Sequence, residues 1–465
     1  MLTYTLEKDR DQSLYISLYR HIRADIATGV LKEGDRLPSK RALAANLGVG
    51  VVTVETAYAQ LIAEGYARAV ERSGVYVCAI GDTARLTSAP LPPEPETPPQ
   101  KPLLDLSGGG GGEDVPFPFS VWVKTMRTVM AEQGQQILRP VDFRGAPELR
   151  RAISDHLYES RGMRVPPERI IVGAGNEHLY GLMVGLLGRQ RIYAAEDPGY
   201  RKITEIYNAN DVTLRHIPLD DAGLSVRELK KSGADIVHIS PAHHYPTGIV
   251  MPIRRRNELL QWAYAQPERY ILEDDYDSEL RHSGTPVPPM FSMDSRERVL
   301  YLSTFSQTIA PSLRIAYVCL PGTLMERFCD TLGFYACAVP TFEQYTLARF
   351  ISSGAYEKHL NRLRKRYRDK RERLMELVAE SRLGAHCRIL EAGAGTHFLL
   401  QLQSKLSDAE LREAAKDRGL SVRFLSDYQS VPTDSGSLIF NYACLDLDRV
   451  PAALEILAEL CREEK

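Results

Sequence analysis

Apolar side chains spaced for helices open the chain and predict a small helical module. Over residues 13–28 they recur every four positions, at Leu14, Leu18, Ile22 and Ile26. A second helical pattern follows Ser39, a plausible N-cap, and ends at Gly48; a third begins near Gly50. Two short helices joined by a glycine-containing turn form a helix-turn-helix. Residues 68–77, RAVERSGVYV, then predict a two-stranded wing.

From Arg169 onward, short apolar runs alternate with helical patterns. This alternation predicts an α/β domain with a mostly parallel sheet. The predicted strands cover 170–172, 191–194, 235–239, 270–272, 299–302 and 315–319. Because ligands of such sheets bind at the carboxyl ends of the strands, the polar clusters that follow these strands predict a binding site.

A proline-dense segment separates the two patterns. Residues 83–102 read TARLTSAPLPPEPETPPQKP and hold almost no large apolar side chain. Such a composition favours an extended, semi-rigid linker. Because 465 residues also exceed one ordinary domain, we predict an N-terminal domain over 1–80 (the head), a linker over 81–102 and a larger domain over 103–465 (the body).

Charge and cysteine usage narrow the class of protein. The 58 basic and 60 acidic residues nearly cancel, so any nucleic-acid-binding surface must be local. No stretch approaches the roughly 20 apolar residues of a bilayer span, and the first residues lack the apolar core of a signal peptide. The seven cysteines are dispersed without metal-ligand spacing, which suits reduced thiols. We therefore expect a soluble, cytoplasmic protein without a membrane partner.

The head resembles the GntR family of winged helix-turn-helix regulators. The stretches GDRLPSKRALAANLGV, TVETAYAQLIAEGY and RSGVYV follow that family's pattern across residues 13–77. The resemblance implies a double-stranded DNA operator as partner. The residues it places at DNA are Arg36, Ser39, Lys40, Arg41, Thr53 and Arg72. By this similarity the first four reach phosphates and groove edges, Thr53 leads the recognition helix, and Arg72 approaches the minor groove.

One position departs from that family. Its members often carry Ser-Arg early in the recognition helix, whereas this chain has Gly50 and Val51. Val51 can touch a thymine methyl but cannot make a bidentate guanine contact. We therefore expect modest affinity for each head. The alternative is that these cationic side chains only form the solvent-exposed surface of a small packed domain.

Five polar clusters lie at the predicted strand ends of the body. They are Gly173–Asn176, Glu196–Tyr200, His243–Gly248, Glu273–Asp277, and Thr304–Gln307 with Arg314 beyond it. Small residues at a helix N-terminus, as in the first cluster, leave N–H groups open to an anion. Each cluster alone could be a turn, a packing contact or a surface ion pair. Five in order at strand ends make coincidence improbable.

These clusters resemble the fold-type I pyridoxal-phosphate proteins, the aspartate aminotransferase superfamily. The similarity runs from about Leu104 to the C-terminus and includes FPFSVW at 117–122, FRGAPELRRAI at 143–153 and HLNRLRKRY at 359–367. A GntR-type head on such a body is the arrangement of the MocR/GabR-type regulators, and the sequence is identified as a member. The resemblance implies an α/β body with large and small subdomains, and a head-to-tail homodimer.

The same resemblance implies a role for each site residue. Asp274 would pair with the pyridinium nitrogen of pyridoxal phosphate, Tyr200 would stack on the ring, and Tyr276 would hydrogen-bond its 3-hydroxyl. The residues that would hold the phosphate are Gly175, Asn176, Thr304, Ser306 and Arg314.

The Schiff-base lysine of the resembling family is replaced in this chain. It stands seven positions before the phosphate arginine, where this sequence has Gln307. A carboxamide nitrogen cannot attack an aldehyde or shuttle the proton, and no lysine lies between Tyr301 and Leu320. We therefore expect the catalytic position to be inactive. The cofactor would be held reversibly, as free pyridoxal phosphate, pyridoxamine phosphate or a preformed amino-acid aldimine.

Three further features leave alternatives open. The C-terminal arginine that holds substrate carboxylates in many aminotransferases is absent from residues 438–442, and Arg423, Arg201 or Lys202 could replace it. Adjacent histidines at 243 and 244 cannot easily share one ion, so no metal site is expected. The basic run at 362–373 predicts a solvated or interface face, with a DNA-backbone contact as the less favoured alternative.

Together these features predict a transcriptional regulator whose body senses pyridoxal phosphate, pyridoxamine phosphate or an amino-acid-like effector. Binding would shift the arrangement of the heads, because a ligand biases only states that it binds unequally. The alternative is a pyridoxal-phosphate-dependent aminotransferase that retains a DNA-binding head. A third hypothesis is a DNA-binding scaffold with an empty pocket.

Overall fold

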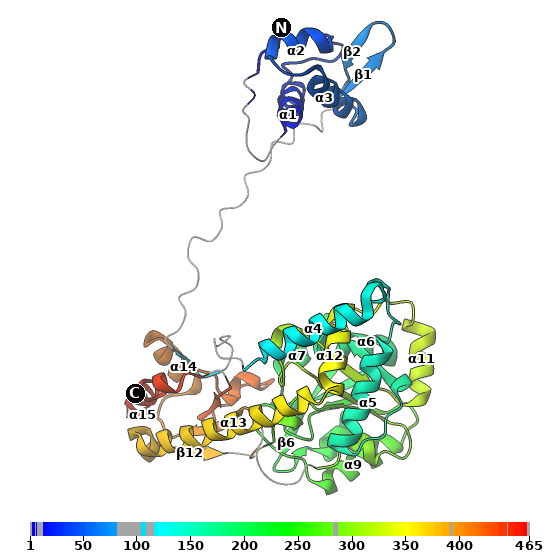
Figure 1. Cartoon of the computed structure of the whole chain (residues 1–465). Helices are drawn as coiled ribbons and strands as arrows, with labels where there is room; N and C mark the ends of the chain where they lie inside the picture. Colours follow the sequence, from blue (N-terminus) through cyan, green and yellow to red (C-terminus); the bar gives the residue numbers. More distant parts are fainter. Residues whose placement is uncertain are drawn as a thin grey trace. The chain divides into compact units, whose positions relative to one another are not determined.

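The computed structural model describes residues 2–4, 6, 13–80, 104–107, 116–281, 287–390, 393, 395–443 and 445–462. The chain divides into two compact units, Met1–Gln100 and Lys101–Lys465 (Figure 1). The proline-rich linker predicted at 81–102 lies outside the described residues.

The first unit is a three-helix module followed by a hairpin. Its elements are α1 (Leu14–Ala27), α2 (Lys40–Leu47), α3 (Val51–Ala63), β1 (Ala67–Val70) and β2 (Gly74–Val77), with β1 and β2 antiparallel. Ser39 caps α2 by accepting a hydrogen bond from the Ala42 N–H at 3.2 Å. Gly48 ends α2 with a φ of 65°, which glycine adopts without steric cost. The predicted helix-turn-helix and wing are confirmed.

The predicted apolar faces form the core of this unit. Leu18, Ile22, Val54 and Leu61 are fully buried. Leu14, which the helical spacing also placed inward, is only half-buried because it is the first residue of its helix. The Tyr58 hydroxyl donates to the Pro38 carbonyl at 2.9 Å and ties α3 to the start of α2.

An eight-stranded sheet forms the centre of the second unit. Its strand order is β4-β11-β10-β9-β8-β5-β6-β7. The strands are β4 (Ile170–Gly173), β5 (Ile192–Asp197), β6 (Thr213–Asp220), β7 (Gly223–Leu224), β8 (Ile236–Ile239), β9 (Tyr270–Asp274), β10 (Val299–Thr304) and β11 (Ala316–Cys319). Pairing is parallel from β10 through β6, whereas β11 runs antiparallel to β10 and β4. The six predicted strands are all present.

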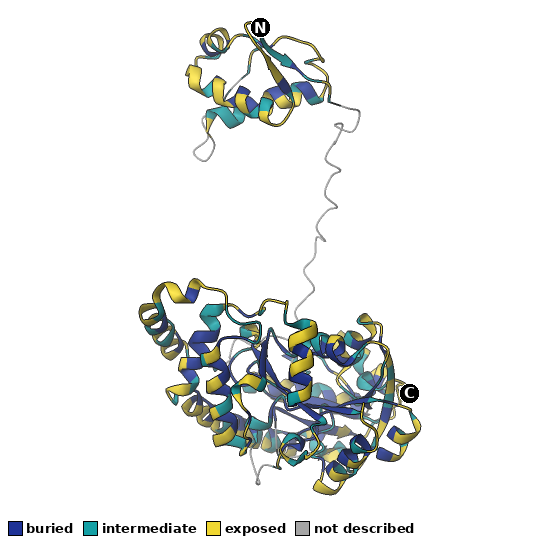
Figure 2. Cartoon of the chain, turned by 90° about the vertical axis from the view of Figure 1, so that its right-hand side faces the viewer, coloured by how far each residue is buried: buried dark blue, intermediate teal, exposed yellow. Residues whose placement is uncertain are grey.

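Helices cover both faces of this sheet. On one face lie α6 (Asn176–Leu187), α7 (Arg201–Ala209) and α11 (Gly322–Leu332), and on the other α4 (Phe119–Gln133), α5 (Pro147–Arg161), α12 (Thr341–Ser352), α8 (Val226–Lys231) and α9 (Ile253–Tyr264), with the short α10 (Met290–Met293). Neighbouring strand residues alternate between the two cores, as for Ile170 and Ile171, because successive side chains point to opposite faces. Figure 2 shows the buried strands enclosed by helices whose outer surfaces are exposed.

A smaller subdomain packs around its own core. It contains the antiparallel strands β12 (Cys387–Leu390), β13 (His397–Leu402) and β15 (Ser437–Asn441), the parallel pair β3 (Leu104–Asp105) and β14 (Leu420–Ser421), and the helices α14 (Asp408–Asp417) and α15 (Val450–Arg462). The 3-10 helices of the second unit are Gly134–Leu138, Pro167–Arg169, Ser278–Leu280, Pro311–Leu313, Arg382–His386, Leu425–Tyr428 and Leu447–Arg449.

One long helix, α13 (Ala355–Glu380), joins the two subdomains (Figure 1). Tyr356 and Leu360 pack in the large-subdomain core, and Leu363, Leu374 and Val378 pack in the small-subdomain core. The two cores are therefore connected by continuous helical backbone. Within the described residues, every helix is too short or too polar to cross a membrane.

Candidate functional site

A cavity of about 670 Å³ lies at the carboxyl edge of the large sheet, next to the small subdomain. Its lining includes the predicted residues Asn176, Tyr200, Asp274, Tyr276, Thr304, Ser306, Gln307 and Arg314. Gly175, the remaining predicted residue of the body, directly precedes Asn176 as the N-cap of α6. Residues that are far apart in sequence therefore line one cavity, because four different strands end there.

One corner of the cavity gathers groups that bind anions. Gly175 has a φ of 90°, and a Cβ at this position would overlap the guanidinium of Arg314. Thr304 Oγ1 donates to Ser306 Oγ at 3.1 Å, so both hydroxyls lie near the end of β10. A guanidinium, two hydroxyls and the N-terminus of a helix form a donor set suited to a phosphate.

A buried carboxylate lies in the same cavity. Asn176 Nδ2 donates to Asp274 Oδ1 at 3.0 Å, and the Tyr180 hydroxyl donates to Oδ2. His238 Nε2 lies 3.6 Å from Oδ2. Asn176 Oδ1 and His238 Nε2 are buried without a hydrogen-bond partner in the described residues. These two atoms show that the polar groups around Asp274 are incompletely satisfied, as expected where a ligand supplies the missing partners.

Tyrosines form the walls of the cavity. The rings of Tyr200 and Tyr245 meet edge to face with centroids 5.9 Å apart. The hydroxyls of Tyr245 and Tyr428 lie 2.9 Å apart, and the Tyr276 hydroxyl is 3.3 Å from His243 Nδ1. Burial raises the pKa of Tyr276 far above its usual value, so its hydroxyl remains a donor at neutral pH. Together with Asp274 and the anion corner, these rings fit a phosphorylated aromatic cofactor such as pyridoxal phosphate.

Gln307 faces the cavity, and its side chain makes no hydrogen bond within the described part of the chain. The next residue is firmly held: Thr308 Oγ1 lies 2.9 Å from the Tyr356 hydroxyl, and its carbonyl lies 2.7 Å from His359 Nε2. Helix α13 therefore fixes the backbone next to the predicted Schiff-base position.

Lys202 is the one lysine among the described residues that line the cavity. The neighbouring Tyr200 and the ion pair with Glu177, at 3.3 Å, raise the pKa of Lys202 above its usual value. Lys202 is therefore held in its protonated, ion-paired form.

The three candidates for binding a ligand carboxylate all line this cavity. Arg201 pairs with Glu205 at 3.0 Å and Lys202 pairs with Glu177. Arg423 forms no ion pair with a carboxylate in the described residues, and it interacts with the Tyr428 side chain instead.

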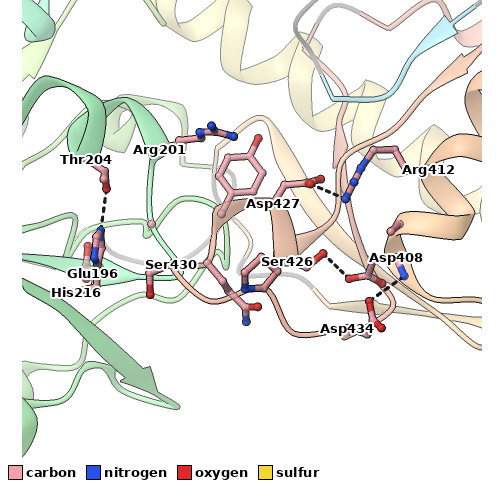
Figure 3. A pocket seen from close by; sticks show the side chains of 15 residues that line it. Glu196, Arg201, Thr204, His216, Asp408, Arg412, Ser426, Asp427, Ser430 and Asp434 are labelled. Atoms are coloured by element: carbon pink, nitrogen blue, oxygen red, sulfur yellow. Dashed lines mark hydrogen bonds and ion pairs between the residues drawn. The ribbon is translucent and has the colours of Figure 1, made fainter. Parts of the chain in front are cut away.

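A second cavity of about 620 Å³ adjoins the first, and Arg201 and Tyr428 line both (Figure 3). Its walls carry the pairs Thr204–His216, Ser426–Asp408 and Arg412–Asp427, at 3.0, 2.6 and 2.5 Å. The Gly199 N–H donates to the Tyr428 carbonyl at 2.9 Å, and the Ser430 N–H donates to Asp197 Oδ1 at 3.0 Å. A loop of the small subdomain is thereby bonded to the segment that carries Tyr200.

The residues of the site that were not found from the sequence include Tyr180, Glu177 and Tyr428. Tyr180 lies four residues after Asn176 on α6, and this helical spacing could have indicated it. Glu177 could have been noticed as the neighbour of Asn176. Tyr428 gave no signal because it comes from the small subdomain, far away in sequence.

In the head, the predicted DNA residues lie on three elements. Ser39 and Arg41 are exposed at the start of α2, Thr53 is half-buried in the first turn of α3, and Arg72 is exposed at the wing turn with a φ of 57°. Arg36 is also exposed, on the segment that bridges to Tyr76 of β2. Lys40 forms an ion pair with Glu55 of α3 at 2.5 Å, a contact the sequence did not indicate.

The adjacent histidines point to different partners. His243 Nδ1 lies 2.7 Å from Asp277 Oδ2, whereas His244 Nε2 lies 3.5 Å from Glu196 Oε2. Burial raises the pKa of Glu196 to about 8, and burial lowers that of His244 to about 3. In the described part of the chain, no three metal-ligating side chains form a group.

These features define a winged helix-turn-helix unit and an aminotransferase-fold unit in one chain. Residues 14–77 match the bacterial regulatory proteins of the gntR family, and residues 109–457 match aminotransferase class I and II. The fold of the body is similar to that of a Pyrococcus horikoshii kynurenine aminotransferase, with a TM-score of 0.69, 24% identity, and coverage of 78% of this chain and 91% of that one.

Relatives match along nearly the whole length. The chain is 37% identical to the HTH-type transcriptional regulator YdeL of Bacillus subtilis, over 94% of this chain and 95% of YdeL. It is 31% identical to the pyridoxine biosynthesis regulator PdxR of Corynebacterium glutamicum, over 96% of each chain. The chain belongs to the MocR-type transcriptional regulators, in which a gntR-family head is joined to an aminotransferase class I and II body.

Proposed function

We propose that this regulator binds pyridoxal phosphate, pyridoxamine phosphate or an amino-acid-like effector reversibly, and that occupancy of the body controls DNA binding by the head. The observation that carries the proposal is Gln307. It faces a cavity that retains the carboxylate, the arginine and the aromatic walls of a cofactor site, but it cannot form the covalent bond.

When bound, pyridoxal phosphate supplies an electron-withdrawing ring and a reactive aldehyde. The residues of this chain would bind and orient it. Arg314, Thr304 and Ser306 would hold the phosphate, and the buried Asp274 would keep the ring nitrogen protonated. Because Gln307 does not supply an amine, the protein acts as a receptor rather than as an aminotransferase.

Arg423 would bind the carboxylate of an amino-acid-like effector. It lines the cavity from the small subdomain and lacks an acidic partner within the described residues, whereas Arg201 and Lys202 are already paired. An effector held by both Arg423 and the large subdomain would favour one arrangement of the two subdomains.

A homodimer fits the exposed apolar side chains of α4. Phe119 is 70% exposed and Met130 50%, and Val123 lies between them on the same face. Large apolar side chains exposed together on one helix face are typical of an interaction surface. We propose that two bodies pair head to tail and bring two heads to paired operator half-sites in the cytoplasm, with Arg36, Ser39, Lys40, Arg41, Thr53 and Arg72 at the DNA. Sedimentation equilibrium of wild type and Phe119→Lys tests this pairing.

Cofactor titration tests the central proposal. We expect saturable binding of pyridoxal phosphate that is lost on dialysis, and no label at position 307 after borohydride reduction. Absorbance that survives dialysis and is fixed by borohydride, or measurable transamination, would favour the enzyme instead. Absence of saturable binding would leave the scaffold hypothesis.

DNA binding is tested with a promoter fragment from the protein's own locus. Retention should weaken steeply with salt, because phosphate contacts release counterions. The double variant Lys40→Ala, Arg41→Ala should lower both affinity and salt dependence. Unchanged binding would contradict the assignment of these cations to phosphates.

A further inference from the structure

Glu177 is a carboxylate in the anion corner of the cavity. It lies in the first turn of α6, directly after Asn176, and lines the cavity. Its Oε2 forms an ion pair with Arg314 Nη2, and its Oε1 lies 3.3 Å from Lys202 Nζ. The arginine that would hold a phosphate is therefore bonded to an acidic side chain of the same protein.

This carboxylate is ionised at neutral pH. Burial raises its pKa, but the hydrogen bond and charge of Arg314 and the contact with Lys202 outweigh burial, so the pKa of Glu177 is below its usual value. Its place in the first turn of a helix also favours a negative charge. The attractions that hold Glu177 are the ones that would hold a phosphate: a guanidinium and the N-terminus of α6.

We propose that Glu177 is an internal competitor for the anion corner, which a phosphate monoester must displace from Arg314 in order to bind. The inference rests on the proposed function in that the phosphate in question belongs to the cofactor. Lys202 remains as a partner for the displaced carboxylate. With Glu177 competing, the cavity would bind phosphorylated ligands with lower affinity than if Arg314 were free. Its occupancy would then rise and fall with the ligand concentration.

The experiment compares the full-length wild type with Glu177→Gln, which keeps the side-chain size and removes the charge. Glu205→Gln is the matched control, because Glu205 lines the same cavity but pairs with Arg201 instead of Arg314. Calorimetric titrations with pyridoxal phosphate, with inorganic phosphate and with phosphate-free pyridoxal provide three dissociation constants for each protein.

We expect Glu177→Gln to bind pyridoxal phosphate and inorganic phosphate about tenfold more tightly, a change of about 1.4 kcal/mol. Its affinity for pyridoxal, and all affinities of Glu205→Gln, should stay within about twofold of wild type. Equal, saturable binding of pyridoxal phosphate by wild type and Glu177→Gln would overturn the inference and leave the proposed function intact.

Two other results separate the proposals. If pyridoxal phosphate binds neither protein but Glu177→Gln gains affinity for inorganic phosphate, the competitor role stands and the proposed cofactor is wrong. An equal gain in Glu205→Gln would mean that the net charge of the cavity, rather than competition for Arg314, controls binding, and would also overturn the inference.

Discussion

The substitution Gly175→Ala tests whether the N-terminus of α6 forms the phosphate corner. Gly175 has a φ of 90°, which costs a residue with a side chain about 1–3 kcal/mol. The new Cβ would also overlap the Arg314 guanidinium and force it to move. Hydrogen bonds to charged groups contribute about 1.5–3 kcal/mol each. We therefore expect the affinity for pyridoxal phosphate to fall by about 10- to 100-fold.

Gly181→Ala provides the control on the same helix. An added Cβ at Gly181 meets no atom within 4 Å, and alanine is the better helix former by about 1 kcal/mol. This variant should melt at the wild-type temperature or slightly above, with unchanged affinity. Equilibrium titration followed by absorbance measures the affinity, and thermal unfolding of the body measures the stability of both variants.

Two results would refute the reasoning. If Gly175→Ala binds pyridoxal phosphate as tightly as wild type, the phosphate does not lie at Gly175 and Arg314. If Gly181→Ala loses affinity to the same extent, the loss of affinity follows from any substitution in this region and is not specific to Gly175. A small decrease in melting temperature with a large loss of affinity in Gly175→Ala alone is the expected pattern.

Three further predictions concern other parts of the chain. Gln307→Lys should retain pyridoxal phosphate through dialysis, because the backbone at this position is fixed and only the amine is missing; a variant that loses the cofactor on dialysis would show further changes in the site. Glu55→Gln should strengthen DNA binding and steepen its salt dependence by about one unit, because it frees Lys40; a filter-binding series that shows no change would contradict this. Burial lowers the pKa of His156, but the hydrogen bond with Glu279, at 2.5 Å, outweighs it and the pKa is raised. This pair therefore stabilises the fold fully below the unfolded pKa of histidine, about 6.5, and the stabilisation is lost as pH rises through the raised folded pKa. Denaturant titrations measure the free energy of unfolding at each pH. From pH 6 to 8.5 it should decrease less in His156→Gln than in wild type.

The sequence predicted those parts of the fold that depend on local patterns. Ser39 and Gly48 bound α2 as expected, because capping and left-handed backbone are properties of single residues. The strands were placed to within a few residues, but β5, β9 and β10 extend further, so Asp197, Asp274 and Thr304 lie within strands rather than after them. Strand β6 was missed because it is half-exposed and its sequence, TLRHIPLD, mixes charges with apolar residues.

The cavity could be predicted only in part. Its large-subdomain side follows from strand ends that converge at one edge of a parallel sheet. On its small-subdomain side Arg423 was one of three candidates, but Tyr428 was not indicated, because its place depends on how two cores pack and no periodicity in one segment encodes that. The pairings of Glu177 with Arg314 and of Lys40 with Glu55 were also unforeseen, because an ion pair between separate elements depends on side-chain positions.

The parallel pair of β3 and β14 affects how the protein is made on the ribosome. Leu104 and Asp105, near the start of the body, pair with Leu420 and Ser421, near its end. The small subdomain therefore cannot be completed until almost the whole chain has been synthesised. The head, which ends near residue 80, can fold about 340 residues earlier. At synthesis rates of about 5–20 residues per second, this is roughly 17 to 70 s. Each nascent chain therefore carries a folded head well before its ligand-binding body exists.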